Sequence, residues 1–120
     1  MIDHVGLRTR EYDVMVAFYK AALAPLGYKI IMQFEGVVGL GREHPDLWIS
    51  KADDSATGQI HLAFSVDDRE AVDKAYAAAL ANGATDNGAP GLRPNYTPTY
   101  YAAFVIDPDG SNLEFICHQG

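Results

Sequence analysis

Two histidines lie at equivalent positions of an internal repeat in this chain. When the sequence is shifted by 57 positions, His4 coincides with His61. The helical stretches that follow also coincide without a gap, so that Tyr19 meets Tyr76 and the Ala-Ala-Leu-Ala run after each tyrosine matches residue for residue. A duplicated unit with one histidine in each copy can place two imidazoles opposite one another across a pseudo-twofold axis. Such a pair is a natural start for a metal site.

A glutamate near the end of the second copy completes a possible ligand set. The last strand expected in the first copy, residues 46–51, aligns with residues 112–117 of the second, which places Glu114 on Trp48. Apolar residues alternate with Glu114, so we expect Glu114 to face away from the helices, on the same side as the two repeat histidines. Trp48 has no atom that ligates a metal, so only the second copy contributes a carboxylate.

The ligand set predicted from these residues is His4, His61 and Glu114. Two imidazoles and one carboxylate with open positions suit a divalent transition metal that also accepts substrate oxygens, namely Fe, Mn, Ni, Co or Zn. The residue types do not choose among these metals. The opposing interpretation is that these are ordinary strand histidines and a solvated glutamate.

The elements needed to position these side chains follow from hydrophobic periodicity. Alternation predicts the strands, and apolar spacing of three and four predicts the two helices. In the first copy we expect a strand at 2–8, a helix begun near Asp13 and ended by Pro25 and Gly27, and strands at 28–34, 37–40 and 47–51. In the second copy we expect a strand at 60–66, a helix at 68–82, a long loop at 83–98 holding one short strand, and strands at 100–106 and 112–118 joined by the turn 107–110.

The predicted fold class is therefore α+β, with two tandem βαβββ modules forming a curved mixed sheet with the helices outside. The first module covers about residues 1–52 and the second about 59–118, with a small polar linker at 52–58 between them. The 120 residues form a single domain, and the concave face of the sheet is the expected ligand site.

Charge and composition exclude several kinds of partner. The net charge is −7, and an acidic surface repels phosphate backbones, which argues against nucleic acid. No apolar run approaches the length of a membrane span, and the first strand begins too early for a signal peptide. Cys117 is the only cysteine, which rules out an internal disulfide and fits a cytoplasmic protein.

Several motifs together resemble the vicinal oxygen chelate superfamily, the group of glyoxalase I, bleomycin resistance proteins and ring-cleaving extradiol dioxygenases. The resemblance covers essentially the whole chain. The matching segments are Ile2-Asp3-His4-Val5-Gly6-Leu7, His61-Leu62-Ala63-Phe64 and Asp107-Pro108-Asp109-Gly110-Ser111-Asn112-Leu113-Glu114. The resemblance implies metal ligation by His4, His61 and Glu114. It also implies a homodimer, in some members with modules exchanged between chains.

Two departures from the family pattern leave the reaction open. Glyoxalase I usually supplies a fourth protein ligand, at the position where this chain has Trp48. The remaining set resembles those of dioxygenases and fosfomycin-inactivating transferases, although ring-cleaving dioxygenases are commonly longer. A small glyoxalase-like lyase or isomerase is the leading prediction, with Glu114 as a candidate base. The alternatives are a small dioxygenase, a fosfomycin-type transferase, or a non-catalytic protein that sequesters a small aromatic or cationic molecule.

Four further residues are candidates for contact with a small-molecule substrate. Trp48 can stack on a planar group, and Arg93 on the long second-copy loop can hold an anion. Tyr96 and Tyr100 flank the same loop. The alternative is a core tryptophan and a surface loop with packing tyrosines.

Overall fold

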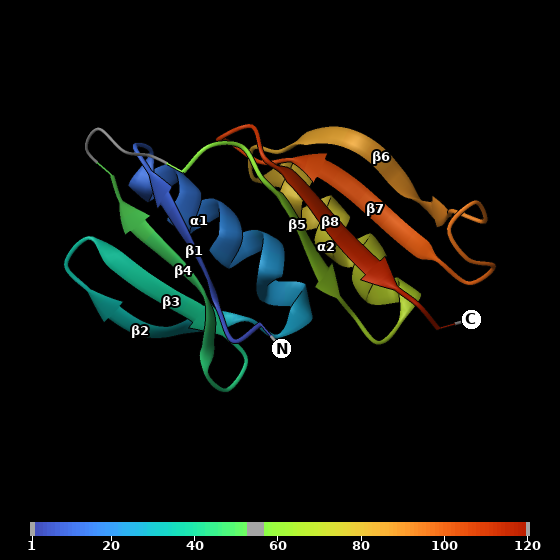
Figure 1. The fold of residues 1–120 in the computed structure, drawn as a ribbon, viewed down its shortest axis with the longest axis horizontal. Helices are drawn as coiled ribbons and strands as arrows, with labels where there is room; N and C mark the ends of the chain where they lie inside the picture. Colours follow the sequence, from blue (N-terminus) through green and yellow to red (C-terminus); the bar gives the residue numbers. More distant parts are fainter. Residues whose placement is uncertain (1, 53–56, 120) are drawn as a thin grey trace.

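The computed structural model describes residues 2–52 and 57–119, and it shows the two copies of the repeat side by side (Figure 1). The first copy consists of β1 (Val5–Thr9), α1 (Tyr12–Leu23), the short 3₁₀ helix η1 (Ala24–Leu26), β2 (Lys29–Phe34), β3 (Val37–Gly41) and β4 (Pro45–Lys51). The second consists of β5 (His61–Ser65), α2 (Arg69–Ala81), β6 (Thr85–Leu92), β7 (Tyr101–Ile106) and β8 (Asn112–Cys117). Most of the predicted linker, residues 53–56, lies outside the described residues.

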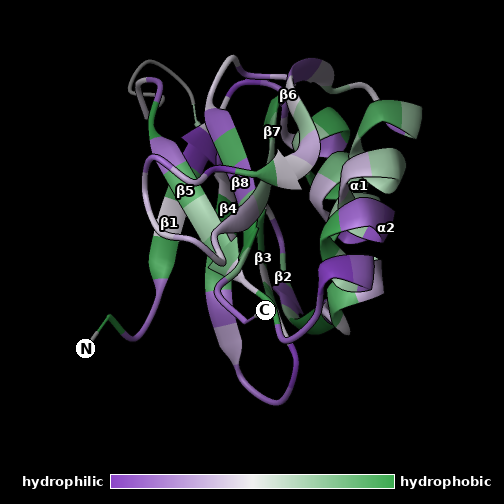
Figure 2. Cartoon of the chain, turned by 90° about the vertical axis from the view of Figure 1, so that its right-hand side faces the viewer, coloured by the Kyte–Doolittle hydropathy of each residue, from purple (hydrophilic) through white to green (hydrophobic). Residues whose placement is uncertain are grey.

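Within the described residues each copy forms its own four-stranded mixed sheet, which confirms the α+β class and the predicted mixed-sheet architecture. The strand orders are β1-β4-β3-β2 and β5-β8-β7-β6. In each sheet the first and last strands of the copy pair in parallel, and the other pairs are antiparallel. Both helices cover one side of the sheets and leave the other side open (Figure 2). We call the uncovered side the open face.

One hydrophobic core runs through both copies under the helices. Leu7, Leu47 and Ile49 of the first sheet and Leu113 and Phe115 of the second belong to the same buried cluster. The two helices also contact one another. Among the described residues, no helix is long and apolar enough to cross a membrane.

A buried hydrogen bond joins the first helix to the second copy. Tyr19 of α1 is 1% exposed, and its hydroxyl donates to Asp107 Oδ2 over 2.6 Å. Asp107 begins the turn between β7 and β8, where its Oδ1 accepts from the backbone N–H groups of Asp109 and Ser111. The turn and α1 are therefore fixed to one another.

The helix boundaries agree with the expected stop signals but differ at the first start. The sequence places the start of α1 near Asp13. In the structure Glu11 occupies the N-cap without a side-chain bond, and Asp13 lies in the first turn. Gly27 follows the helix with φ +86°, which favours glycine. In α2 the Asp68 carboxylate caps the helix by accepting from Ala71 N over 2.8 Å.

We expect Asp68→Ala to lower the free energy of unfolding by about 1 kcal/mol, because the first turn of α2 loses its only side-chain cap among the described residues. Urea titration measures the change. Asp67→Ala is the matched control, since it removes an equal charge one residue earlier and no hydrogen bond. Equal losses in the two variants would contradict the capping role.

The segment after α2 differs from the expected loop. β6 spans eight residues, Thr85–Leu92, and its pairing with β7 shifts register between Asp86 and Gly88 and again between Gly88 and Gly91. The strand contains glycine and proline, so its sequence lacks the hydrophobic alternation that predicts a strand. The same residues interrupt its hydrogen-bond ladder with β7.

Candidate functional site

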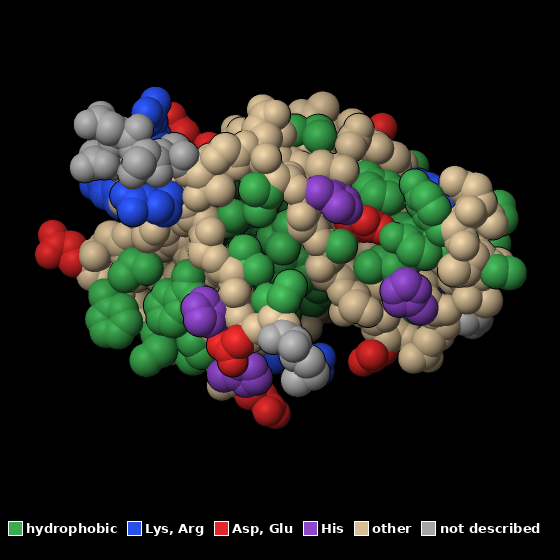
Figure 3. All heavy atoms as spheres, viewed as in Figure 1, with side chains coloured by type: hydrophobic (Ala, Val, Ile, Leu, Met, Phe, Trp, Pro, Cys, Tyr) green, Lys and Arg blue, Asp and Glu red, His purple; other side chains and the backbone are tan. Residues whose placement is uncertain are grey.

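The open face of the second sheet brings together most of the residues proposed from the sequence. Strand alternation directs Leu113 and Phe115 into the core and Glu114 to the open face, as expected. His61 lies on the neighbouring strand β5. Hydrophobic side chains cover much of this face, with histidine and acidic groups set among them (Figure 3).

Glu114 is the centre of this site. Its side chain is nearly fully buried, and each carboxylate oxygen has a partner. Oε1 lies 3.0 Å from His61 Nε2, and Oε2 accepts a 2.5 Å hydrogen bond from the Tyr100 hydroxyl. Burial, followed by the hydrogen bond to Glu114, raises the pKa of Tyr100 to about 12. Tyr100 therefore stays protonated at neutral pH and acts as a donor.

The two ring nitrogens of His61 both face oxygen atoms. Nδ1 lies 3.2 Å from the carbonyl oxygen of Asn112, while Nε2 faces Glu114. When Nδ1 donates to the Asn112 carbonyl, Nε2 meets Glu114 Oε1 through a proton between the two atoms or through a cation in place of that proton. A histidine that binds a metal usually gives its other N–H to a carbonyl or carboxylate, and Asn112 offers that support here.

The separation between His61 and Glu114 suits two ligands of one metal ion. Ligand bonds of about 2.0–2.1 Å at roughly right angles place the two ligand atoms about 3 Å apart. The 3.0 Å gap between Nε2 and Oε1 is of that size, and its donor types match. Neighbouring elements provide both groups, so the pair is preorganised.

An aromatic and cationic row extends from this pair across the sheet. The Phe104 ring of β7 stacks with the His61 ring at 6.4 Å between centroids, and the Arg93 guanidinium lies 5.5 Å from the Phe104 centroid. Tyr100 contacts the Tyr96 ring at 4.9 Å, and Tyr96 is largely exposed. Arg93, Tyr96 and Tyr100 therefore lie around the pair that Glu114 and His61 form.

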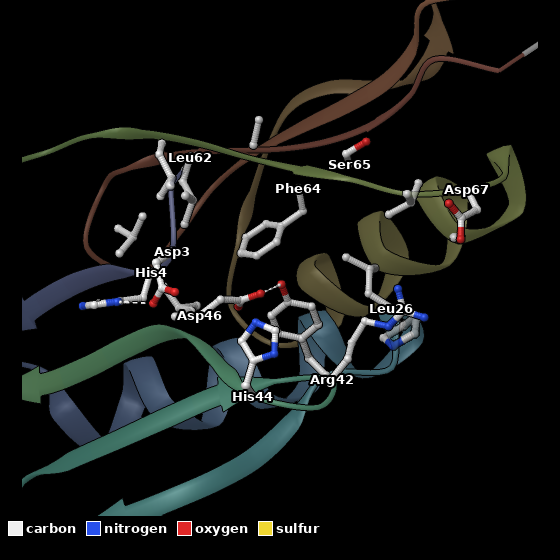
Figure 4. Close-up of a pocket in the computed structure, with 18 of the residues that line it drawn as sticks. Asp3, His4, Leu26, Arg42, His44, Asp46, Leu62, Phe64, Ser65 and Asp67 are labelled. Atoms are coloured by element: carbon white, nitrogen blue, oxygen red, sulfur yellow. Dashed lines mark hydrogen bonds and ion pairs between the residues drawn. The ribbon is translucent and has the colours of Figure 1, made fainter.

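His4 lies elsewhere in the described chain. It precedes β1, its ring is exposed, and its Nδ1 contacts Asp3 Oδ1 at 2.8 Å. It lines a cavity of about 630 Å³ between the two copies, together with Tyr28, Asp46 and Phe64 (Figure 4). The residues that line this cavity include neither His61 nor Glu114.

Within residues 2–52 and 57–119, no three His, Cys, Asp or Glu side chains come close enough together to hold a metal ion. Within one chain, His61 and Glu114 therefore lie together, and His4, the third predicted ligand, lies away from them.

Trp48 lies on the first sheet, opposite Gly39 in the register of β3 and β4. A Cβ at Gly39 would lie 3.0 Å from the indole ring, so the absence of a side chain there lets the ring lie against the strand. Met32 and Phe34 of the adjacent β2 are both exposed. The first sheet therefore has an apolar, aromatic surface that one chain leaves uncovered.

Phe104 and Asn112 also belong to the site, although neither was predicted from the sequence. Alternation in the strand Tyr101–Ile106 could have placed Phe104 beside Glu114, because the two are register partners. No comparable signal exists for Asn112, which contributes only its backbone carbonyl.

A comparison with models of protein families shows which family this chain belongs to. The model of the glyoxalase/bleomycin resistance protein/dioxygenase superfamily matches residues 1–115. The chain belongs to this superfamily. Members of the superfamily generally use divalent metals, which fits the donor types found at Glu114 and His61.

Solved structures of superfamily members share the fold. A glyoxalase/bleomycin resistance protein from Albidiferax ferrireducens T118 is 26% identical, with 95% of each chain covered and a TM-score of 0.80. A family enzyme from Burkholderia phytofirmans PsJN is 24% identical over 98% of each chain, with a TM-score of 0.75. A lactoylglutathione lyase from Agrobacterium tumefaciens is 22% identical over 98% of this chain and 92% of its own, with a TM-score of 0.68. A comparison with curated proteins finds no significant match.

Proposed function

We propose that this superfamily member is a metal-dependent, glyoxalase-like enzyme of the lyase or isomerase type that acts on a small substrate with vicinal oxygens. The observation that carries the proposal is the buried Glu114 carboxylate, held between His61 and Tyr100 on an open face. A buried carboxylate is costly unless it is fully bonded, and this one is bonded by groups typical of a metal site.

His61 and Glu114 would hold the metal, and His4 of a second copy would supply the third protein ligand. A homodimer accounts for the separation of His4 from the pair within one chain. The uncovered apolar surface of the first sheet, with Trp48, is a suitable surface for that contact. The metal, when bound, polarises carbonyl oxygens of the substrate as a Lewis acid.

The protein groups around the pair have separate roles in this proposal. Tyr100 donates to Glu114 Oε2 and orients the carboxylate, and Glu114 would be the base that accepts a proton from the substrate. Asn112 fixes the ring of His61 through its carbonyl. Tyr96 of one chain and Trp48 of the second copy would line the substrate site, and their rings would exclude water from it.

Other reactions on the same ligands remain as alternatives. A small dioxygenase or a fosfomycin-type transferase would use the same three residues, and the identity of the bound metal would separate them. A sequestering protein without catalysis is favoured by one observation, the exposed side chains of Met32 and Phe34 beside the half-buried Trp48 on an acidic chain.

Metal content tests the proposal. Untagged protein is incubated separately with Fe(II), Mn(II), Ni(II), Co(II) and Zn(II), desalted, and analysed for metal. We expect about one ion of the preferred metal per chain, and nearly complete loss in His61→Ala, Glu114→Ala and His4→Ala. Loss in His4→Ala together with a dimeric sedimentation coefficient supports the shared site.

His44→Ala is the control, because His44 is exposed in the turn before β4 and belongs to no proposed ligand set. It should retain the wild-type metal content. Wild-type protein that takes up none of the five metals contradicts the enzyme proposal and favours sequestration.

A further inference from the structure

Arg93 is held in a cradle built by the irregular part of β6. The ladder with β7 goes from Gly88 directly to Gly91, so that Ala89 and Pro90 have no register partner. The carbonyls of Ala89 and Gly91 accept from Arg93 Nη2 and Nη1, each over 2.9 Å. The two register shifts thus fix the orientation of one guanidinium.

Gly88 and Gly91 leave room beside the strand for the Arg93 guanidinium. A Cβ at Gly88 would lie 3.2 Å from Arg93 Nη2 and 3.2 Å from Phe104 Cδ1, and one at Gly91 would lie 3.2 Å from Nη1. Gly88 also has φ +146°, which favours glycine. The strand is therefore shaped to let the guanidinium lie against it, beside Phe104.

The charge of Arg93 is not neutralised by the part of the chain that the structure describes. No carboxylate there lies within ion-pair distance of it, although the chain carries 16 acidic residues and a net charge of −7. Arginine has five N–H donors, and the two carbonyls use one on each Nη. A half-buried cation with fixed geometry and remaining donors suits an external anion.

We infer that Arg93 is a receptor for a carboxylate group of the substrate. This rests on the proposed function, because it places the substrate on the face of His61 and Glu114. Phe104 touches both the guanidinium and the His61 ring, so the substrate carries its carboxylate at one end and its vicinal oxygens at the other. The guanidinium fork matches a planar carboxylate, and neutral analogues lack that interaction.

Binding of benzoate to metal-free protein tests the receptor directly. Chelator-treated protein is titrated with benzoate and with its neutral isostere benzamide at low salt, up to about 20 mM, a range that covers the millimolar affinity expected of a small fragment. We expect saturable benzoate binding that is about tenfold or more tighter than benzamide binding. Arg93→Gln should remove that preference, and Arg93→Lys should restore only part of it.

Arg42→Gln is the matched control, because it removes an arginine near the cavity between the copies and not on this face. It should bind benzoate as the wild type does. Absence of saturable benzoate binding in the wild type, or an unchanged preference in Arg93→Gln with a wild-type unfolding midpoint, overturns the inference.

The same proteins separate this inference from the proposed function. Arg93→Gln should keep the wild-type metal content, while His61→Ala should lose metal and keep its preference for benzoate over benzamide. If no variant or wild type takes up metal but the preference still depends on Arg93, the receptor stands and the metal enzyme does not.

Discussion

Replacing Tyr19 by phenylalanine should lower the free energy of unfolding by about 2–3 kcal/mol, one of the two largest effects expected in this chain. The Tyr19 hydroxyl donates to Asp107 Oδ2, and both residues are buried. Its loss leaves a carboxylate oxygen without a donor in the core, which costs more than the bond itself contributes. Urea unfolding of the two proteins measures the difference.

The repeat supplies a matched control for this variant. Tyr76 is the equivalent residue of the second copy, and it donates to Asp86 over 2.7 Å at the surface. Because water can replace that bond, Tyr76→Phe should cost clearly less than Tyr19→Phe. Similar losses in the two variants would show that the buried bond carries no special stability.

The contribution of Tyr19 to stability should also depend on pH. Burial, and then the charge of Asp107, raise the pKa of Tyr19 above the 10.0 of an unperturbed tyrosine. The folded protein therefore keeps a proton that the unfolded chain releases, so stability is present below pH 10 and is lost as the pH rises above it. The free energy of unfolding should fall more steeply above pH 10 in the wild type than in Tyr19→Phe, since the other tyrosines are common to both.

Gly41→Ala should destabilise the fold by about 3 kcal/mol or more. Gly41 ends β3, and a Cβ there would overlap the carbonyl oxygen of His44 and lie 2.9 Å from its carbonyl carbon. Both are backbone atoms of the turn before β4, so a change of rotamer cannot relieve the overlap. Thermal or urea unfolding measures the loss.

Gly6→Ala is the control for this substitution. Gly6 lies in β1, and a Cβ there would meet nothing within 4 Å. We expect a change of at most about 0.5 kcal/mol. A loss at Gly6 equal to that at Gly41 would mean that glycine flexibility, and not the overlap with the turn, sets the cost.

The sequence predicted the repeat, the fold class and the direction of Glu114, because each depends on local periodicity. Apolar residues stand on both sides of Glu114 in the strand, at Leu113 and Phe115, so its open-face position follows from the local pattern. The pairing of Glu114 with His61 also followed, because both copies begin and end with adjacent parallel strands.

The position of His4 did not follow from the sequence. The repeat makes His4 equivalent to His61 in sequence. It does not determine whether the two residues of one chain face the same site. The docking of the two modules decides that, and this docking depends on contacts of the helices and of the turn at Asp107, which are far apart in sequence. The site that holds Arg93 could not be predicted either, because its glycines and proline are typical of a loop.

The division of the strands into two separate sheets has a consequence for how the chain folds during synthesis. In the described residues no strand of one copy pairs with a strand of the other, so the ladder of the first sheet closes within residues 5–51. That sheet can form while the second copy is still being made. Its helix, however, holds Tyr19 without an acceptor until Asp107 is synthesised and the last hairpin forms. The first module is therefore expected to collapse early and to become rigid late, in the step that docks it onto the second.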